Sequence, residues 1–321
     1  MRESYNGHEK GIFYFPAGLG YGMFATEVPP TKNPTLGGHT MRQPLSEAER
    51  RKPYAKYFDE PYPPVPEDIL EQMARPMDPA LALPIQERND LLNPGYLPRE
   101  VGWCVMPDGS GYIASLTRMP GVTLEMIEWW FAWHGLESLR YQIWDPNDHY
   151  LARVSPDHRQ RRLDPALSWR ERNWNTSDFV LENVGEGTSA LRISFRSPES
   201  FGFDMERFNA QPVTAICAHS GPPDWDIPRT TFIHFARAVE GGIELRTRFW
   251  LGWMIVNKQP VRTDFAVDPR RVQGLSRHSP QEYYRLAKYL PQIFAENHDK
   301  PDRAEDLTVM DFAGSVQKHW L

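Results

Sequence analysis

The sequence predicts an α+β fold in which a curved antiparallel sheet grips a long C-terminal helix and leaves a cavity between them. Two observations predict it. Several segments in the second half of the chain alternate apolar and polar residues, which is the period of a strand with one buried face. One long helical pattern then follows at about residues 279–297, before a polar tail. Strands followed by a late helix are typical of α+β proteins, and a cavity in such a fold is where a small ligand binds.

Prolines are concentrated near the N-terminus, where 15 of the 30 precede residue 99. Because proline fixes φ and removes a hydrogen-bond donor, we expect this segment to be extended and to wrap around the rest. Within it, residues 67–74 are predicted as a short helix. The Gly-rich stretch at residues 18–22 lacks the G-x-G-x-x-G spacing of a dinucleotide site and is interpreted as a turn. We therefore divide the chain into a wrapping segment, residues 1–98, and a main domain, residues 99–321.

Turn and capping signals place the elements that follow. Residues 111–117 are predicted as a strand and Pro120-Gly121 as a turn. Thr123 is the predicted N-cap of a helix that ends near His134. Alternation predicts five further strands at residues 178–184, 191–196, 213–219, 230–238 and 243–249.

Composition excludes several function classes. The formal net charge is -6, and no basic cluster is interleaved with aromatic residues, so nucleic acid is not an expected partner. No run approaches the roughly 20 apolar residues of a membrane-spanning helix. Two cysteines are too few for a disulfide scaffold or a four-thiolate zinc site. A cytoplasmic protein that does not engage a membrane is therefore expected.

His134 continues the apolar face of its predicted helix. Leu124, Ile127, Phe131 and His134 lie at i, i+3, i+7 and i+10 and so share one side. An inward histidine is either a metal ligand or a core residue that is hydrogen bonded to a backbone carbonyl. Taken alone, the core interpretation is the commoner one.

Glu182 shares one face of its predicted strand with Val180 and Val184. If that face is buried, the carboxylate must be paired, protonated or bound to a metal, because a bare buried charge is too costly. If the face is exposed, Glu182 is ordinary. The strand pattern leaves both interpretations open.

His278 and Glu282 are four residues apart, so two consecutive helical turns can bring both side chains to one metal ion. The competing interpretation is a capping box, with Ser279 as N-cap, Pro280 at the first helical position and Glu282 at the third. From spacing alone the cap is favoured.

His219 ends a predicted strand just before the turn at Gly221-Pro222, a place where acid/base groups often line a cavity mouth. A plain surface histidine is the alternative. Together the four features supply two histidines, two glutamates and one further histidine. Two nitrogen and two carboxylate ligands suit zinc and, less specifically, iron or manganese.

Two stretches of this sequence resemble the 2,4-diacetylphloroglucinol hydrolase family, which includes phloretin hydrolase. They are residues 128–134, Glu-Trp-Trp-Phe-Ala-Trp-His, and residues 141–150, Tyr-Gln-Ile-Trp-Asp-Pro-Asn-Asp-His-Tyr. Residues 217–219 and the His278-x-x-x-Glu282 pair fit the same family in order and approximate spacing. The likeness covers roughly residues 100–297. The W-H…W-x-P-x-x-H segment, from Trp133-His134 to His149, is fairly specific, whereas the His-x-x-x-Glu pair alone is weak.

The resemblance implies a helix-grip, START-like fold and a zinc ion bound by two histidines and two glutamates. It implies cleavage of the carbon–carbon bond between an acyl group and a phenolic ring, with a small aromatic ketone as substrate, and a homodimer. Carried over by position, the metal ligands are His134, Glu182, His278 and Glu282. His219 is then the catalytic acid/base. Our hypothesis for the mechanism adds that Glu182 accepts a proton as well as binding the metal.

Two departures limit the carry-over. The interval from His134 to Glu182 is longer than in the family because of a polar insert at residues 155–175, which leaves Glu171 as a competing ligand. The family's substrate-contacting tyrosine is missing near the start of the first helix, where Met126 stands. His234 is a candidate for the substrate pocket.

Two other functions compete with a metal-dependent hydrolase. One is a non-catalytic helix-grip carrier of an apolar or aromatic ligand, which would bind no metal. The other is a metal-free polyketide cyclase, which would use His219 without the histidine and glutamate quartet.

Overall fold

The computed structural model describes residues 42, 44–224, 226–300 and 302. The Gly-rich stretch at residues 18–22 and most of the predicted polar tail lie outside these residues. No helix in the described part of the chain is both long and apolar enough to cross a bilayer.

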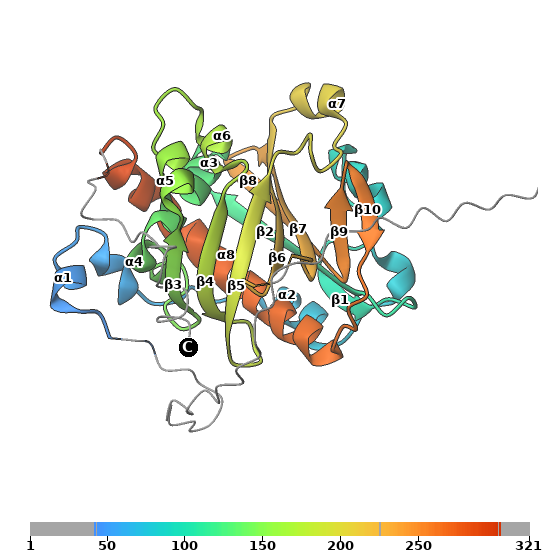
Figure 1. The fold of residues 1–321 in the computed structure, drawn as a ribbon. Coiled ribbons are helices and arrows are strands. Elements are labelled where there is room, and N and C mark those ends of the chain that lie inside the picture. The colour runs from blue at the N-terminus through green and yellow to red at the C-terminus, as the bar shows by residue number, and fades with distance from the viewer. Residues whose placement is uncertain (1–41, 43, 225, 301, 303–321) are drawn as a thin grey trace, which may run out of the picture.

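One sheet of eight strands dominates the fold (Figure 1). Its order is β1-β2-β8-β7-β6-β5-β4-β3, and every neighbouring pair is antiparallel. The strands are β1 (Gly102–Val105), β2 (Gly111–Pro120), β3 (His149–Val154), β4 (Ser177–Asn183), β5 (Thr188–Arg196), β6 (Val213–Gly221), β7 (Thr230–Val239) and β8 (Gly242–Leu251). A separate hairpin pairs β9 (Trp253–Val256) with β10 (Gln259–Arg262).

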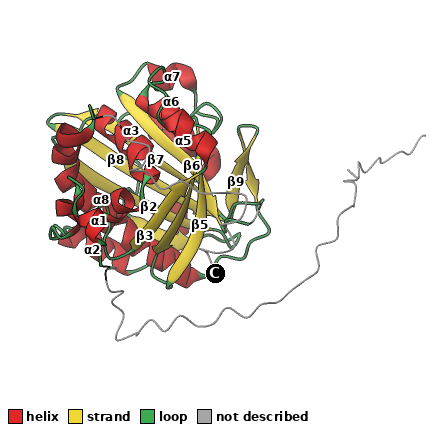
Figure 2. Ribbon diagram, turned by 60° about the vertical axis from the view of Figure 1, so that its left-hand side comes forward, coloured by secondary structure: helices red, strands yellow, loops and turns green. Residues whose placement is uncertain are grey.

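The long helix α8 (Pro269–Asn297) crosses one face of this sheet and packs on β2, β1 and α3 (Figures 1 and 2). The other α-helices are α1 (Glu47–Arg50), α2 (Glu67–Ala74), α3 (Leu124–Trp133), α4 (Ser138–Gln142), α5 (Pro156–Arg162), α6 (Trp169–Asn173) and α7 (Met205–Asn209). Short 3₁₀ helices are η1 (Ala55–Phe58), η2 (Pro79–Leu81), η3 (Ile85–Leu92) and η4 (His134–Leu136).

Each face of the sheet carries its own hydrophobic core, because successive side chains of a strand point to opposite sides. On β6, Ile216 and Ala218 belong to the core beneath α8 and α3, whereas Ala215 and Cys217 belong to the core on the other face. The described part of the Pro-rich segment contributes to both. η1 and α2 pack in the first core and η3 packs in the second. The division of the chain at residue 98 stays a prediction.

The predicted α+β plan, with a large antiparallel sheet and a late helix, is confirmed. Every predicted strand is present, α2 has the predicted bounds, and Thr123 caps α3 by accepting a hydrogen bond from the Met126 amide. Alternation did not reveal β1, β3, β9 or β10, which are only four to six residues long. The assignment to the helix-grip fold itself stays a prediction.

The predicted start of the last helix is wrong. α8 begins ten residues earlier, at Pro269, and its N-cap is Asp268, which accepts a hydrogen bond from the Arg270 amide. Ser279 and Pro280 lie inside the helix, and the Ser279 hydroxyl lies 3.3 Å from the Ser115 hydroxyl on β2. Packing against the sheet therefore outweighs the backbone hydrogen bond that Pro280 removes. Since there is no capping box at Ser279, the Glu282 carboxylate is not needed as a cap.

α8 approaches the sheet edge through two glycines. A Cβ built on Gly274 would lie 2.5 Å from the carbonyl oxygen of Val184 and 3.2 Å from the Cα of Gly185, in the turn after β4. Gly185 also has a φ of 98°, which favours glycine. Backbone thus touches backbone where the helix passes the turn.

Candidate metal centre and substrate cavity

The structure brings two histidines and two glutamates together between the sheet edge and α8. His149 on β3 and Glu182 on β4 are paired directly across the two strands, and the register shifts just after His149. Directly paired residues point to the same face. His278 and Glu282 lie one turn apart on α8. The first two side chains come from the sheet and the other two from the helix that covers it.

The donor atoms of these four residues are close to one another. Nε2 of His149 lies 3.6 Å from Oε2 of Glu282 and 3.9 Å from Oε2 of Glu182. Nε2 of His278 lies 3.7 Å from Oε2 of Glu282. A metal about 2.0–2.2 Å from each of four tetrahedral ligands separates them by roughly 3.3–3.6 Å. The three donor–donor distances above are within about 0.6 Å of this range, which is compatible with one ion shared by the four residues.

Polar atoms of the cluster lack the partners that burial normally demands. Nε2 of His149 is buried and has no hydrogen-bond partner. Among the described residues, no lysine or arginine forms an ion pair with Glu182 or Glu282. Buried carboxylates without a cation are costly unless they are protonated or bind a metal. The residues present therefore fit a divalent ion.

The electrostatics of the cluster follow from burial and mutual charge. Burial raises the pKa of Glu282 well above its usual value, which Glu182 reinforces and His278 opposes. Burial likewise raises the pKa of Glu182. For His278, burial acts to lower the pKa, but the charges of Glu282 and nearby acidic groups outweigh it and raise the pKa to about 10. Burial lowers the pKa of His149 well below its usual value.

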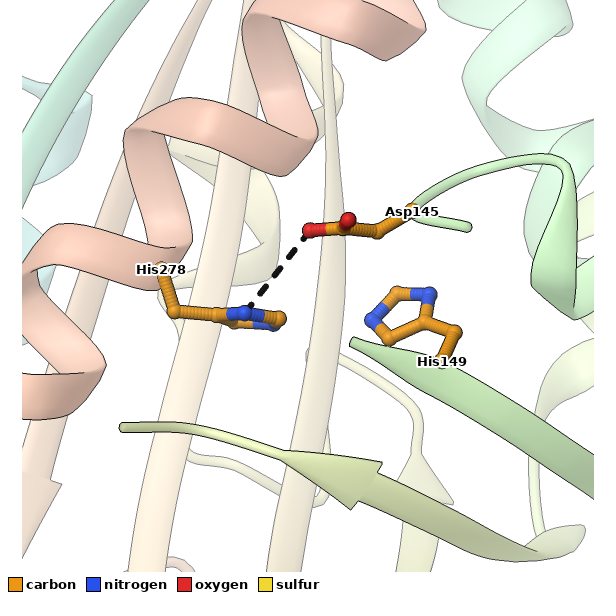
Figure 3. Close-up of side chains that lie close together, drawn as sticks. All are labelled: Asp145, His149 and His278. Carbon is orange, nitrogen blue, oxygen red and sulfur yellow. Dashed lines mark ion pairs between the residues drawn. The ribbon is translucent and has the colours of Figure 1, made fainter. Parts of the chain in front are cut away.

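A further acidic pair lies behind His278. Nδ1 of His278 is 3.6 Å from Oδ2 of Asp148 and 3.8 Å from Oδ2 of Asp145. Asp145 accepts a hydrogen bond from the Tyr62 hydroxyl. Asp145, His149 and His278 are close enough for their ligand atoms to lie within 4.8 Å of one another (Figure 3). This triad overlaps the quartet through its two histidines.

Tyr141 supports the sheet side of the cluster. Its ring stacks on His149, with ring centroids 3.9 Å apart and planes within 3°. Its hydroxyl donates a hydrogen bond to Oε2 of Glu182, and its carbonyl oxygen lies 3.2 Å from Nδ1 of His149. A proton on Nδ1 leaves Nε2 with a lone pair, which is the form that binds metal.

His134 is not brought to this cluster, although it lines the same cavity. Its Nδ1 lies 2.8 Å from the Trp130 carbonyl oxygen, which is the hydrogen bond expected of a core histidine. The ring stacks on Trp130, with centroids 5.4 Å apart. Burial lowers the pKa of His134 to about 3. The hydrogen bond to the Trp130 carbonyl acts to raise this pKa, and the charge of Arg162 acts to lower it. In the quartet, His149 takes the place predicted for His134.

His219 lies on the opposite face of the sheet. It follows Cys217 in the alternation of β6, and Cys217 belongs to the core on the other side. Its Nε2 accepts a hydrogen bond from the Ile255 amide of β9 at 2.9 Å. Burial, with the charge of Arg196, lowers its pKa to about 4. His219 is therefore separated from the cavity by the sheet.

His234 on β7 lines the cavity, as predicted. Its Nδ1 lies 3.0 Å from the Thr247 hydroxyl, and its ring stacks on Phe131 with centroids 5.6 Å apart. Burial lowers its pKa to about 3, with His134 acting in the same direction. The imidazole is therefore neutral near pH 7.

Glu171, the competing ligand, caps its own helix. It forms a capping box with Ser168 at the start of α6, and its carboxylate accepts hydrogen bonds from the Ser168 amide and hydroxyl. Those bonds lower its pKa. The polar insert therefore supplies no ligand from Glu171.

The cavity lies between the sheet and α8, is lined by Glu182, His278 and Glu282 of the cluster, and has about 700 Å³ of free space, part of it open to solvent. Tyr283 lines the cavity, and its hydroxyl is buried and has no hydrogen-bond partner. Burial raises its pKa well above the usual value, so it can only donate or accept as a neutral phenol. Aromatic and aliphatic walls surround these groups: Phe131, Trp144, Val180, Val184, Leu191, Ile193, Phe195, Phe232, Phe249 and Leu275.

A family model described as the DAPG hydrolase PhiG domain matches residues 83–295. The chain belongs to the DAPG hydrolase family. The match includes every element of the main sheet, the cavity and most of α8.

Named relatives agree with the family. The chain is 32% identical to a phloretin hydrolase of Eubacterium ramulus over 264 residues, which cover 79% of this chain and 94% of that protein. It is 28% identical to a 2,4-diacetylphloroglucinol hydrolase of a Pseudomonas species over 267 residues, which cover 78% of this chain and 90% of that protein. A 2,4-diacetylphloroglucinol hydrolase of Pseudomonas protegens is also 28% identical, over 78% of this chain and 86% of that protein. Family members of this group are thus hydrolases named for small phenolic ketones.

Three residues of the site were missed from the sequence: His149, Tyr141 and Tyr283. His149 lies in the stretch at residues 141–150 that carries part of the resemblance, but β3 is too short to show alternation. Tyr141 begins that same stretch. Tyr283 directly follows Glu282, so only the three-dimensional course of α8 reveals that both face the cavity.

Proposed function

We propose that this protein is a metal-dependent hydrolase that cleaves the carbon–carbon bond between an acyl group and a phenolic, phloroglucinol-like ring. The observation that carries the proposal is the convergence of His149, Glu182, His278 and Glu282, of which the two glutamates and His278 line an apolar cavity. Two nitrogen and two carboxylate donors favour zinc, with iron or manganese as less specific fits. Membership of the family and the names of its hydrolases support the substrate class.

The quartet is a better candidate than the triad of Asp145, His149 and His278. His278 presents Nε2 to Glu282 and Nδ1 to Asp145 and Asp148. A histidine that binds metal through one nitrogen normally gives its other N–H to a carboxylate, which fixes the ring. Asp145 and Asp148 fill this orienting role if the ion lies on the Nε2 side. Asp145 is further engaged by Tyr62.

When bound at these donors, a divalent metal polarises a carbonyl group or lowers the pKa of water towards 7. The side chains must then move protons. Hydrolysis adds OH from water to the acyl carbon and H to the ring carbon, so one group accepts a proton from water and one delivers a proton to the ring.

His234 is the proposed proton carrier in place of His219, since it lines the cavity as a neutral imidazole. Thr247 holds its Nδ1, and Nε2 is the nitrogen left to exchange a proton with substrate. Glu182 keeps its predicted second role as a proton acceptor, with its position fixed by Tyr141. Tyr283 is the proposed donor to a phenolic oxygen of the ring.

The apolar walls suit a flat aromatic substrate. Phe131, Phe232 and Phe249 surround His234, with ring centroids 4.8–5.8 Å from its own. A phenolic ring that stacks there excludes water from the reacting carbon and keeps it beside the imidazole. Apolar surroundings with few polar groups are typical of a site that orients one ligand.

The test is metal content and turnover of the same preparation. Elemental mass spectrometry of freshly purified protein should find about one zinc, iron or manganese per chain. Incubation with acylphloroglucinols should release the deacylated ring and one carboxylic acid in equal amounts. Protein that stays metal-free after incubation with zinc and only binds the ketone would instead be a ligand carrier. Metal-free protein that converts a polyketide would be a cyclase.

A further inference from the structure

A second cavity, the outer cavity, lies on the face of the main sheet that is turned away from α8. Strands β5 and β6 form its floor, and β9 together with Pro222 and Pro228 forms its walls. It has about 680 Å³ of free space, part of it open to solvent. Among the described residues, none lines both this cavity and the one beneath α8. The outer cavity is therefore a separate place for a ligand to bind.

Strand β5 carries the two cavities on its opposite faces, because successive side chains of a strand point to opposite sides. Ile193 and Phe195 line the cavity beneath α8. Arg192, Ser194 and Arg196 line the outer cavity. A ligand in the outer cavity is therefore kept apart from the metal donors by the sheet itself.

Arg196 brings a positive charge to this floor, and no carboxylate in the described part of the chain forms an ion pair with it. Its guanidinium donates to the backbone carbonyl oxygen of Phe195 at 2.8 Å, and its other N–H groups have no described acceptor. Burial lowers the pKa of Arg196, and the charge of Arg192 acts in the same direction. Asp226, which also lines the cavity, is exposed. An anion that reaches the floor would relieve the repulsion between the two arginines.

His219 adds a neutral hydrogen-bond donor to the same cavity. Its Nε2 accepts a hydrogen bond from the Ile255 amide at 2.9 Å. A ring nitrogen that accepts carries no proton, so the proton of the neutral imidazole is on Nδ1. Among the described residues, none accepts a hydrogen bond from this Nδ1. The structure thus explains the form of the ring but gives its N–H group no partner.

The pairing of β5 with β6 places these two donors side by side. Ser194 pairs directly with His219, and Arg196 pairs with Cys217, two residues before His219. Arg196 and His219 are therefore diagonal neighbours on one face of the sheet, roughly 7–8 Å apart at the backbone. A guanidinium and one imidazole N–H match the two oxygens of a planar carboxylate. A phosphate group has a third oxygen, for which these two residues offer no further strong donor.

The walls of the outer cavity are apolar. Met254 and Ile255 lie on β9, and Pro222 and Pro228 lie between β6 and β7. On the floor, Gly221 pairs with Arg192 and has no side chain to fill the space beside it. A few polar groups at one end and apolar surroundings at the other are typical of a site that orients one small ligand. The ligand that fits has a charged group joined to a hydrocarbon body.

We propose that the outer cavity is a binding site for a small organic carboxylate. Arg196 and His219 hold the two carboxylate oxygens, and the hydrocarbon body lies against Met254 and the two prolines. The inference does not depend on the proposed hydrolase function, because the two cavities share no lining residue. Benzoate is a suitable probe, since it joins a planar carboxylate directly to an apolar ring.

Isothermal titration of the purified protein with benzoate tests the inference, at about 0.15 M salt so that distant charges are screened. A ligand of this size should bind with a Kd of about 0.1–1 mM. Benzamide has the same shape without the charge, and acetate has the charge without the ring. Both should bind at least about 10-fold more weakly than benzoate, because each lacks one of the two matched features.

Arg196→Gln should weaken benzoate binding by about 10- to 100-fold, because a hydrogen bond from a charged donor is lost. Arg196→Lys keeps the charge but loses the planar fork, so it should weaken binding by less than about 10-fold. The matched control is Arg153→Gln. Arg153 pairs with Phe179, which pairs with Arg192, so it lies on the same face of the sheet but outside the cavity. Arg153→Gln should change the Kd by less than about two-fold.

Two further measurements locate the bound carboxylate. His149→Ala removes a donor of the candidate metal centre and should keep the binding that Arg196→Gln removes. In protein labelled with 13C at its methionine methyl groups, benzoate should shift the Met254 resonance, which Met254→Leu identifies. That shift should be absent in Arg196→Gln.

Four results would each overturn the inference. They are the absence of saturable benzoate binding, an equal loss of affinity in Arg153→Gln and Arg196→Gln, and complete loss of binding in His149→Ala, which would place the carboxylate at the metal. The fourth is tighter binding of phenyl phosphate than of benzoate, which would make the cavity a phosphate site. Wild-type affinity for benzoate in Arg196→Lys with a large loss in Arg196→Gln would support it, since both variants must fold to give that pattern.

Discussion

Nε2 of His149 and Oε2 of Glu282 lie 3.6 Å apart, although one side chain begins the third strand and the other lies in the last helix. The sheet edge and α8 therefore meet at this point, and a metal bound there would join them. His149→Ala should remove one ligand and leave metal content near zero in elemental analysis.

His134→Ala is the matched comparison, since His134 lines the same cavity but is engaged by Trp130. Its metal content should stay near the wild-type value, with turnover reduced through a changed cavity wall. His219→Ala should alter neither quantity by more than about two-fold, because the sheet separates it from the cavity. Loss of metal in His134→Ala with retention in His149→Ala would restore the ligand set expected from the sequence.

Asp145→Asn distinguishes the two overlapping donor sets. If Asp145 only orients His278 through Nδ1, metal affinity should fall by about 10- to 100-fold and remain measurable. If Asp145 is itself a ligand, the loss should match that of His149→Ala. Competition with a fluorescent chelator measures both. Glu282→Gln completes the comparison, because it should abolish binding in the first case and weaken it in the second.

Tyr141→Phe should lower both metal affinity and kcat by roughly 10-fold, because the Glu182 carboxylate loses the hydroxyl that positions it. Tyr57→Phe is the control. The Tyr57 hydroxyl also donates to a glutamate, Glu296, at 2.9 Å, but it does so away from the cavity. Equal effects of the two changes would mean that the Tyr141 result reflects a general loss of stability.

Two buried neutral histidines each contribute a loss of stability in acid, whereas the raised pKa values of Glu182 and Glu282 act in the opposite direction. The folded pKa of His134 and of His234 is lowered to about 3, whereas an unfolded histidine titrates near 6.5. The unfolded chain therefore binds more protons between these values, so the stabilisation is complete above pH 6.5 and is lost as the pH falls towards 3. Each histidine contributes a slope of up to about 1.4 kcal/mol per pH unit in that window.

Urea unfolding of chelator-treated protein at pH 7.5, 6 and 5 measures this slope. His234→Asn should be less stable at pH 7.5. Its free energy of unfolding should depend less steeply on pH, because the contribution of one histidine is removed. A slope that stays unchanged in the variant would mean that His234 is already protonated in the folded protein.

Gly274→Ala should destabilise the protein although alanine is the better helix former by about 1 kcal/mol. The new Cβ would lie 2.5 Å from the Val184 carbonyl oxygen, so α8 must move away from the turn after β4. We expect a net loss of about 1–3 kcal/mol together with weaker metal binding. Thermal unfolding should show the loss, with the exposed Arg277→Ala as control. A higher melting temperature in Gly274→Ala would refute the close contact.

Pattern and local signals were sufficient for most of the fold. Strands such as β5 and β8 have one apolar face over nine or ten residues, and Thr123 caps α3 as its residue type favours. These sequence signals failed where contacts between residues far apart in the chain determine where a helix begins. Ser279-Pro280 has the local chemistry of a helix start, yet contact with Ser115 on β2 keeps it within α8.

The site could be predicted only in part. Glu182, His278, Glu282 and His234 all line the cavity, because their strand or helix periodicity was correct. His134 was preferred to His149 because its helix had a visible apolar face, whereas β3 begins at His149 and offers no alternation before it. His219 was misplaced because strand alternation by itself does not say which of two buried faces carries the cavity.

The contact between Gly185 and Gly274 sets how closely α8 approaches the sheet, although neither glycine lines the cavity. Glu182 lies near the end of β4, just before the turn that contains Gly185. His278 follows Gly274 by one turn of α8. A side chain at either glycine would push α8 away from the turn after β4. It would thereby increase the distance between the Glu182 carboxylate and the His278 imidazole. Redesign for a larger ion or a bulkier ketone therefore has a starting point outside the reaction chemistry, where the four donors keep their identities and only their spacing changes.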